Sequence, residues 1–486
     1  MTQLSELQSC NFYPTLPSAF FTRHAPQAIE NPRLVIKSDN CAKLIGIKPE
    51  SVSNAVSLNI LSGAAVPSSW QPLAMKYFGH QFGYLNPDLG DGRGLLLAQT
   101  KNQQGEVWDL HLKGAGTTNY SRGGDGRAVL RSSIREFLAS ESHAALGIAT
   151  TRALAVVTSD TPVYRETEER AATLLRVARS HIRFGHFEFA YHSKDKKLTE
   201  HLARYVVERH YPCLLPNETG FADMFRLICE STGRMIVDWQ SVGFAHGVMN
   251  TDNMSIIGDT FDYGPYGFMD RFRSNYICNH SDNQGRYAFD RQPAIAHWNL
   301  SVLAQALTPI LSSEQLNAGI SAFSEVFNAG FVNRMRSKLG LNETQAEDSS
   351  FIFETLQTLQ KCRLDYSFFF RKISSDDLEL GLESIRNESI DVNAFDHWCN
   401  NYKMRLEMED QEQTVRAQQM RTRNPARVLR NHLAQDAIKA AEQGDYSVVN
   451  RLHTSLLTPF EDNPEYSDLA ALPPKDSEEL AISCSS

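Results

Sequence analysis

The chain has 486 residues, which is long enough for about three average domains or for one two-lobed enzyme. Hydrophobic residues make up 42% and charged residues 22%, as in ordinary soluble globular proteins. The formal net charge of -9 argues against a general nucleic-acid binder, because recognition of a phosphate backbone depends on a basic surface. We therefore expect no nucleic-acid partner.

The sequence carries no targeting or membrane signal that we recognise. Residues 1–26 contain no basic stretch followed by a long apolar run, and nowhere do eighteen apolar residues occur in succession. We expect a cytoplasmic protein with no membrane contact. The eight cysteines are scattered, without a Cys-x-x-Cys pair or a zinc-like spacing, so we expect neither a disulfide framework nor a zinc site.

A tetrapeptide Gly-Asp-Gly-Arg occurs twice, at residues 90–93 and 124–127. Glycine turns that carry Asp and Arg favour ligand-facing loops over linkers. After the first turn, residues 95–98 predict a buried strand, and residues 107–113 alternate between apolar and polar side chains, as a strand does. Lys113, at the end of this second strand, is predicted to point away from the apolar layer.

Apolar residues at helical spacing predict a helix over residues 130–146, with Gly147 as its terminator. Glu136 lies beside the apolar face of this helix. A strand lysine followed by a helix glutamate is the pair with which protein kinases hold the lysine on nucleotide phosphates. Taken alone, Lys113 and Glu136 would more often be two unrelated surface residues. The pair therefore indicates a kinase-like site only in combination with the other motifs of the chain.

Basic residues cluster locally although the chain is acidic as a whole. Such clusters suit a phosphate-bearing small ligand, and a solvated basic face is the alternative. The two clusters are Arg122, Arg127, Arg131 and Arg135, and then Arg176, Arg179 and Arg183.

A helix predicted over residues 221–244 leads into a segment that resembles a protein-kinase catalytic loop, His246-Gly247-Val248-Met249-Asn250-Thr251-Asp252-Asn253, and Asp262-Tyr263-Gly264 follows. In kinases the corresponding pattern supplies a catalytic Asp and two metal ligands. Asn253 and Asp262 occupy the ligand positions, but Val248 replaces the catalytic Asp. A valine cannot accept a proton, so the chemistry must differ from ordinary phosphoryl transfer or use another base.

Residues 254–261 predict two short strands joined by a turn at Gly258-Asp259. On this interpretation Asn253 and Asp262 share one face and lie diagonal to each other, at roughly 7 Å. Two oxygen-bearing side chains at that separation could converge on one small cation. Mg²⁺ suits such a site, because it takes oxygen ligands and completes its shell with water and phosphates. An ordinary polar hairpin with a solvated Asp is the alternative.

Helical patterns dominate from about residue 198 onward, and they predict further helices over 294–311, 315–339, 351–364 and 425–443. Residues 459–486 are rich in Pro, Asp, Glu and Ser, which is typical of a loosely packed tail.

We therefore predict an α+β, protein-kinase-like fold of two lobes. The N-terminal lobe is mixed strand and helix, and the C-terminal lobe is mainly helical. The predicted divisions are an extension that packs on the core (1–74), the N-terminal lobe with its nucleotide-binding loops (75–190), the C-terminal lobe with the catalytic loop and metal-binding segment (191–445), and a tail (446–486).

Over almost its whole length the chain resembles the selenoprotein O family, whose bacterial members are the YdiU-type proteins. The resemblance rests on motifs at residues 77–83, 89–94, 112–116, 121–136, 183–188 and 243–264. It implies a pseudokinase with a protein-kinase-like fold that transfers AMP, rather than phosphate, from ATP to Ser, Thr or Tyr hydroxyls of protein substrates. For some members it implies UMP transfer from UTP to His or Tyr. The nucleotide is implied to bind flipped relative to kinases, which exposes its α-phosphate.

The resemblance also implies roles for individual residues. Asp252 would be the proton acceptor, Asn253 and Asp262 would ligate Mg²⁺ or Mn²⁺, and Glu136 would orient Lys113. Neighbouring strand residues face opposite ways, so Asp252 and Asn253 can serve one site only if the backbone bends just before Asn253. We expect an aspartate with an ordinary pKa to take the proton late in the reaction. The implied nucleotide-binding residues are Gly90, Gly92, Arg93, Lys113, Asp125, Gly126, Arg176, Arg183 and Asp262.

Two other functions remain open, a protein kinase that uses an unconventional base and an inactive nucleotide-binding pseudokinase that acts as a scaffold or redox-sensing partner.

Cys484 lies close to the C-terminus, where the family sometimes carries selenocysteine. A reversible disulfide between Cys484 and Cys278 is a further hypothesis. An inert tail thiol is its alternative.

Overall fold

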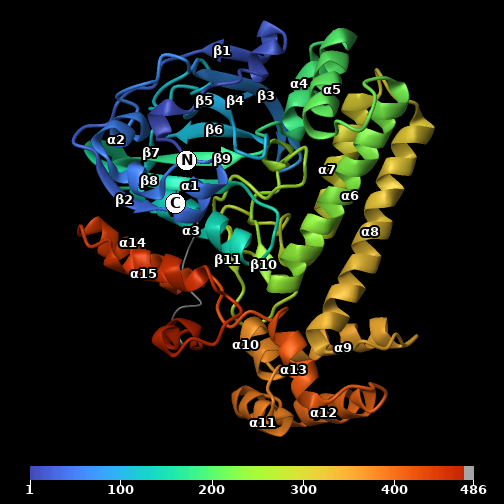
Figure 1. The fold of residues 1–486 in the computed structure, drawn as a ribbon. Coiled ribbons are helices and arrows are strands. Elements are labelled where there is room, and N and C mark those ends of the chain that lie inside the picture. Colours follow the sequence, from blue (N-terminus) through green and yellow to red (C-terminus); the bar gives the residue numbers. More distant parts are fainter. Residues whose placement is uncertain (475–486) are drawn as a thin grey trace.

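A large antiparallel sheet organises the N-terminal part of the molecule (Figure 1). The computed structural model describes residues 1–474. Within them the strand order is β1-β3-β5-β6-β9-β8-β2, with β4 paired to β3 and β7 to β9. The strands are β1 (Phe21–Arg23), β2 (Arg33–Lys37), β3 (Leu73–Gln81), β4 (Tyr84–Gly90), β5 (Gly94–Lys101), β6 (Val107–Lys113), β7 (Ala128–Val129), β8 (Arg152–Tyr164) and β9 (Glu168–Ala178).

The strands predicted at residues 95–98 and 107–113 are confirmed as parts of β5 and β6. Both faces of this sheet are covered, because side chains alternate between the faces and neighbouring leucines enter different cores. Leu174 packs in one core with Ile134 of helix α3 (Leu130–Ala145), whereas Leu175 packs in the other with Leu61 of helix α2 (Ala55–Leu61). As a result, the polar face of β6 is buried too, and Lys113 lies inside the protein.

Residues 1–74 are built into this part of the fold rather than appended to it. They supply β1 and β2, the two ends of the strand path, and helices α1 (Asp39–Leu44) and α2.

The remainder of the chain is mainly helical, with one small two-stranded sheet, β10 (Phe244–Ala245) and β11 (Gly267–Phe268). The predicted helices over 130–146, 221–244, 294–311, 315–339 and 351–364 are confirmed, with ends that differ by a few residues, and the one predicted over 425–443 is shorter. The helices are α4 (Phe184–His192), α5 (Lys196–His210), α6 (Glu218–Val242), α7 (Gln292–Leu307), α8 (Ser313–Leu339), α9 (Asp348–Lys361), α10 (Tyr366–Lys372), α11 (Leu378–Glu388), α12 (Val392–Leu406), α13 (Gln413–Arg421), α14 (Asn431–Glu442) and α15 (Ser447–Leu456).

Two long helices, α6 and α8, run side by side through this helical part (Figure 1). Their close approach depends on Gly319 of α8, where a Cβ atom would lie only 2.5 Å from the ring of Phe225 in α6. The packing holds α6 rigidly against its neighbours, and α6 leads directly into the loop at residues 246–253.

The C-terminal helices return to the sheet-containing part. Helices α14 and α15 pack against α3, where His453 meets the ring of Phe137 edge to face at 5.0 Å. The expected loose packing of residues 459–474 is wrong for Tyr466, which is buried, with the guanidinium carbons of Arg427 and Arg451 each 5.6 Å from its ring. The described part of the predicted tail is therefore anchored to the body of the protein.

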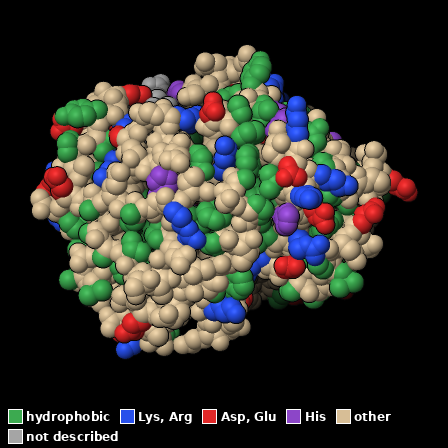
Figure 2. All heavy atoms as spheres, turned by 90° about the horizontal axis from the view of Figure 1, so that it is seen from above, with side chains coloured by type: hydrophobic (Ala, Val, Ile, Leu, Met, Phe, Trp, Pro, Cys, Tyr) green, Lys and Arg blue, Asp and Glu red, His purple; other side chains and the backbone are tan. Residues whose placement is uncertain are grey.

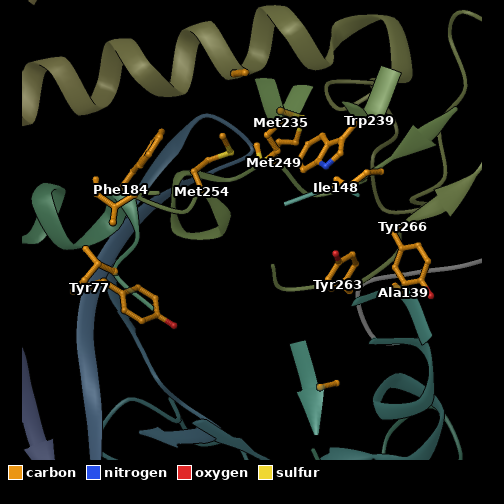
Figure 3. Close-up of a cluster of buried hydrophobic side chains, with 14 of the residues drawn as sticks. Tyr77, Ala139, Ile148, Phe184, Met235, Trp239, Met249, Met254, Tyr263 and Tyr266 are labelled. Atoms are coloured by element: carbon orange, nitrogen blue, oxygen red, sulfur yellow. The ribbon is translucent and has the colours of Figure 1, made fainter. Parts of the chain in front are cut away.

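The structure thus confirms a mixed class of strands and helices with an antiparallel sheet. On the face shown in Figure 2, basic, acidic and hydrophobic side chains are interspersed. The core that contains Leu174 and Ile134 continues into the helical part and includes Met249 of the loop at 246–253. Figure 3 shows Trp239, Met235 and Met249 together in it, with Met254 and Phe184 beside them.

Candidate active site

A pocket of about 660 Å³ lies between the glycine turns of the sheet-containing part and the loop that follows α6. Its lining includes every residue for which the sequence indicated a direct role in the site, although these residues are spread over more than 170 positions of the chain. They are Gly90, Gly92, Arg93, Lys113, Asp125, Gly126, Arg176, Arg183, Asp252, Asn253 and Asp262.

The loop at residues 246–253 is held by hydrogen bonds along its length. The imidazole Nε2 of His246 lies 3.0 Å from the backbone oxygen of Phe261, and the ring stacks on Trp239. The amide of Asn299 donates to the backbone oxygen of Met249 at 2.9 Å. These contacts fix the loop before any ligand binds, because none of them involves a group that a ligand would take up.

Residues Thr251–Asn253 form a single 3-10 turn, η5. This turn is the bend that the sequence required just before Asn253, and it lets two neighbouring residues, Asp252 and Asn253, line the same pocket. Asn253 donates its side-chain amide to the backbone oxygen of Val248 at 2.9 Å. The oxygen of that amide is therefore the end left for a ligand.

The predicted hairpin over residues 254–261 is wrong. Ser255 bridges to Arg183 and Thr260 to Thr150, so the two halves of the segment pair with other elements rather than with each other. The backbone N–H of Ile256 donates to Ile182 at 3.0 Å, and that of Thr260 donates to Ala149 at 2.8 Å. A short apolar segment satisfies its backbone groups with whichever neighbours the fold supplies, and here the fold supplies them from outside.

Asp262 follows this segment with a positive φ of 58°, a backbone conformation that non-glycine residues rarely adopt. Its carboxylate forms two ion pairs, one with Arg176 at 2.6 Å and one with Arg183. Burial alone would raise the pKa of Asp262, but the two guanidinium groups outweigh it and hold that pKa well below its usual range. Asp262 is therefore ionised at neutral pH.

Lys113 and Glu136 meet as predicted, with Nζ 2.5 Å from the glutamate oxygen. Glu136 also pairs with Arg176, a contact that the sequence did not predict. Burial favours the neutral form of Glu136, yet Arg176 and Lys113 lower its pKa to about 2. Burial lowers the pKa of Lys113 to about 8, against the opposing effect of Glu136. We call Lys113, Glu136, Arg176, Arg183 and Asp262 the charge network.

The two glycine turns form the other side of the pocket. Gly90 has a φ of 154°, and a Cβ atom there would lie 2.5 Å from the ring of Tyr120, so only glycine fits. Gly126 has a φ of 67°, and a Cβ atom there would lie 2.1 Å from the backbone of Gly116. Asp125 pairs with Arg165 at 2.8 Å on the protein surface. Glycine at these positions lets the backbone approach a ligand closely.

Two guanidinium groups on the turns have no hydrogen-bond or ion-pair partner among residues 1–474. They belong to Arg93 and Arg122, which both line the pocket and are both exposed. Of the other clustered arginines, Arg127 also lines the pocket, but Arg131 pairs with Glu169 and Arg179 with Asp259, away from it. The sequence identified the two arginine clusters, but it could not predict which of their members line the pocket.

Asp252 is buried, and the environment of its two carboxylate oxygens differs. Oδ2 accepts a hydrogen bond from Gln81 at 3.1 Å, while Oδ1 is buried without a partner in the described part of the chain. Burial raises the pKa of Asp252 to about 7, although Arg183 opposes this. The expectation of an ordinary pKa is therefore wrong, because the sequence could not show how far this side chain is removed from water.

Asn253 and Asp262 could together hold a divalent cation. Each oxygen of Asp262 accepts from one arginine and keeps a second lone pair, and the side-chain oxygen of Asn253 is available. Carboxylate and amide oxygens suit Mg²⁺ or Mn²⁺. No group of three or more His, Cys, Asp or Glu side chains suited to a metal occurs within residues 1–474.

The disulfide hypothesis involves Cys484, which lies outside the described residues. Its suggested partner, Cys278, is buried, with Sγ 3.4 Å from the backbone oxygen of Ala245.

Comparison with known proteins agrees with this geometry. Residues 3–457 match the family model described as "Protein adenylyltransferase SelO". The chain is 49% identical to a "Protein nucleotidyltransferase YdiU" of Pseudomonas aeruginosa strain LESB58 and to one of Pseudomonas putida strain W619, in each case over 486 residues and 100% of both chains.

No helix within the described residues is both long and apolar enough to cross a membrane. The family match covers the charge network and the residues that line the pocket on the glycine turns and on the loop with Asp252 and Asn253. The chain therefore belongs to the SelO family, and it is an enzyme of the protein nucleotidyltransferase class.

Proposed function

We propose that this enzyme transfers AMP from ATP to Ser, Thr or Tyr hydroxyls of other proteins, with Mg²⁺ or Mn²⁺ as cofactor. One observation carries the proposal: Val248 stands where a kinase base would be, whereas the carboxylate residue Asp252 lines the same pocket as the cations Arg93, Lys113 and Arg176. A base at this different position in the loop suits attack at a phosphorus atom other than that of the γ-phosphate.

The distribution of positive charge supports attack at the α-phosphorus. In that reaction pyrophosphate leaves, and negative charge grows on the oxygen between the α- and β-phosphates. Lys113 and Arg176 on one side of the pocket, and Arg93 on the other, would bind the phosphates that leave. Guanidinium groups suit this task because two of their N–H donors match two phosphate oxygens.

The carboxylate of Asp252 would hold the attacking hydroxyl and take its proton. A base works best when its pKa lies near the working pH, and burial brings that of Asp252 to about 7. Its neighbour Asn253, with Asp262, would hold the metal. The metal, when bound, supplies positive charge that neutralises the phosphate oxygens.

We also infer that the fold is a protein-kinase-like one of two lobes. The support is the order along the chain, which runs from a glycine turn through Lys113 and Glu136 to Asn253 and Asp262, together with the ion pair between Lys113 and Glu136. In kinases a lysine and glutamate in this order form the same pair.

Isotope placement tests the proposal. The purified protein is incubated with protein acceptors and with ATP labelled at either the α- or the γ-phosphate. Label transferred only from the α-phosphate supports AMP transfer, and label only from the γ-phosphate would show a kinase with an unconventional base. Transfer of neither label would indicate a nucleotide-binding scaffold. Label from the α-phosphate of UTP on His or Tyr would reveal UMP transfer, which the family resemblance also implies.

A further inference from the structure

The hairpin of β3 and β4 lies directly against the loop that carries Asp252. The backbone N–H of His80 donates to the hydroxyl of Thr251 at 2.7 Å, and that of Phe82 donates to the side-chain oxygen of Asn250 at 3.2 Å. The hairpin turns at Phe82 and Gly83, whose φ values are both positive, at 52° and 89°. Two such residues in succession are typical of a tight two-residue turn, so the hairpin is a rigid element.

Two residues of β3 contact the carboxylate of Asp252. Gly79 leaves space for it, since a Cβ atom at this position would lie 2.4 Å from Oδ1. Gln81 donates its side-chain amide to Oδ2 at 3.1 Å. Oδ1 lies buried against Gly79 and has no hydrogen-bond partner in the described part of the chain, while the residue as a whole lines the pocket. The hairpin thus distinguishes the two oxygens of one carboxylate.

The orientation of the Gln81 amide is itself determined by Asn86 on β4. The Asn86 amide nitrogen donates to the oxygen of Gln81 at 3.1 Å, so the nitrogen of Gln81 must face Asp252. The oxygen of Asn86 in turn accepts from the backbone N–H of Asp88 at 3.0 Å. A backbone N–H can only donate and an ionised carboxylate can only accept, so when Asp252 is ionised both ends of this chain of hydrogen bonds require the same direction.

We propose that Asn86 and Gln81 are positioning residues, which hold the Asp252 carboxylate through Oδ2 in the one orientation that serves the acceptor hydroxyl. The inference deepens the proposed function and rests on it. Neither residue needs to touch the substrate: Asn86 lies outside the pocket lining, although Gln81 belongs to it.

Other charged groups near Asp252 do not fix its carboxylate. Arg183 donates to the backbone oxygen of Asp252 at 2.6 Å, while its charge and that of Asp262 act on the carboxylate only through space. Tyr77 and Tyr287 are the remaining titratable neighbours. Within residues 1–474, Gln81 is the side chain that donates a hydrogen bond to the carboxylate itself.

The sharpest test is Asn86→Asp, which changes one nitrogen to oxygen at nearly constant size. Asp at this position cannot donate to Gln81, so the Gln81 amide turns and its oxygen faces Asp252. We expect kcat for transfer of α-labelled AMP to casein to fall about tenfold, as for loss of one well-placed hydrogen bond. ATP affinity stays unchanged, because Lys113, Arg176 and Arg93, which would bind the phosphates, are not altered. Asp88→Ala is the matched control, since Asp88 contributes only its backbone N–H, and it keeps the wild-type kcat.

Added negative charge alone could also lower kcat, and a double-mutant cycle separates the two effects. In a Gln81→Leu background the added charge of Asn86→Asp remains, but the hydrogen bonds that run from Asn86 through Gln81 to Asp252 are absent. We call these hydrogen bonds the relay. We expect Asn86→Asp to have no further effect on kcat there. If Asn86→Asp lowers kcat as much in the Gln81→Leu variant as in the wild-type enzyme, the proposed relay is wrong.

Thermal unfolding provides a readout that needs no activity. Asn86→Asp is expected to lower Tm by about 2 °C. It should leave Tm unchanged in an Asp252→Asn background, because an amide at position 252 can turn and donate to Gln81. An equal fall in both backgrounds, or none in either, would refute the relay. Absence of α-label transfer by the wild-type enzyme would instead refute the proposed function, and the Tm cycle would still decide the relay.

Discussion

The two sides of the pocket differ in how their charges are satisfied. In the charge network, Glu136 is 1% exposed and bonds two cations, and Asp262 bonds two arginines. On the glycine turns, Arg93 and Arg122 are exposed, and their guanidinium groups form no hydrogen bond or ion pair with the described residues. The network is therefore part of the folded core, and its geometry is set before nucleotide binds. The turns present cations whose partners must come from a ligand. Four predictions follow from this contrast, in order of decreasing effect.

Asp262→Ala should abolish nucleotidyl transfer, because it removes a proposed metal ligand and leaves Arg176 and Arg183 without their shared anion. The measurement is transfer of α-label from ATP, with circular dichroism to establish that the variant is folded. Asp259→Ala is a useful comparison, since Asp259 also pairs with an arginine, Arg179, but lies outside the pocket. Full activity of a folded Asp262→Ala enzyme would contradict the metal assignment.

Glu136→Gln should lower the free energy of unfolding by about 3 kcal/mol, since a buried carboxylate paired with two cations is lost. The pKa of Glu136 is lowered from 4.5 to about 2 on folding, so its contribution is fully present above pH 4.5 and is lost as the pH falls toward 2. Urea unfolding between pH 7 and pH 3 measures this, and the variant should show the shallower loss of stability.

The exposed pair of Arg386 and Asp396 serves as the control for this measurement. Asp396→Asn should leave stability unchanged, because solvent screens both partners. Equal effects of the two substitutions would remove the distinction between the buried network and surface ion pairs.

Arg93→Ala and Arg122→Ala should each raise the Kd for ATP by about tenfold, as expected for loss of one charge-assisted hydrogen bond to phosphate. Neither should change the free energy of unfolding by more than about 0.5 kcal/mol, because neither guanidinium is bound within the described part of the protein. Isothermal titration with ATP tests affinity, with Arg423→Ala as an exposed control outside the pocket. A loss of stability without a change in the Kd for ATP would show that these arginines stabilise the fold rather than bind the nucleotide.

Asp125→Asn should have the smallest effect. It weakens the exposed pair with Arg165, and we expect the free energy of unfolding to change by no more than about 0.5 kcal/mol. ATP binding should weaken a few-fold, through looser ordering of the second glycine turn, where Asp125 also accepts from the backbone N–H of Arg127 at 2.9 Å. A large loss of stability on thermal unfolding would show that this turn belongs to the core.

The sequence by itself determined the residue types of the site and the elements that carry them. Helical periodicity predicted α3 and α6, and strand alternation predicted β6. These inferences succeeded because the periodicity of a strand or helix is a local property of the chain. The pairing of Lys113 with Glu136 was predicted from the likeness to kinase motifs and from the family resemblance, and the structure shows it. The motif around Val248 likewise marked the loop that lines the pocket.

Only the tertiary structure decided how those residues are paired and solvated. Residues 254–261 have strand-like composition, yet they bond to Ile182 and Ala149, which no local pattern could indicate. Arg176 joins Glu136 to Asp262 because β9 lies next to β6 in the sheet. The pKa of Asp252, and its contact with Gln81, depend on burial beneath a hairpin about 170 positions earlier in the chain. Burial and long-range pairing are properties of the packed molecule, so they could not be read from neighbouring residues.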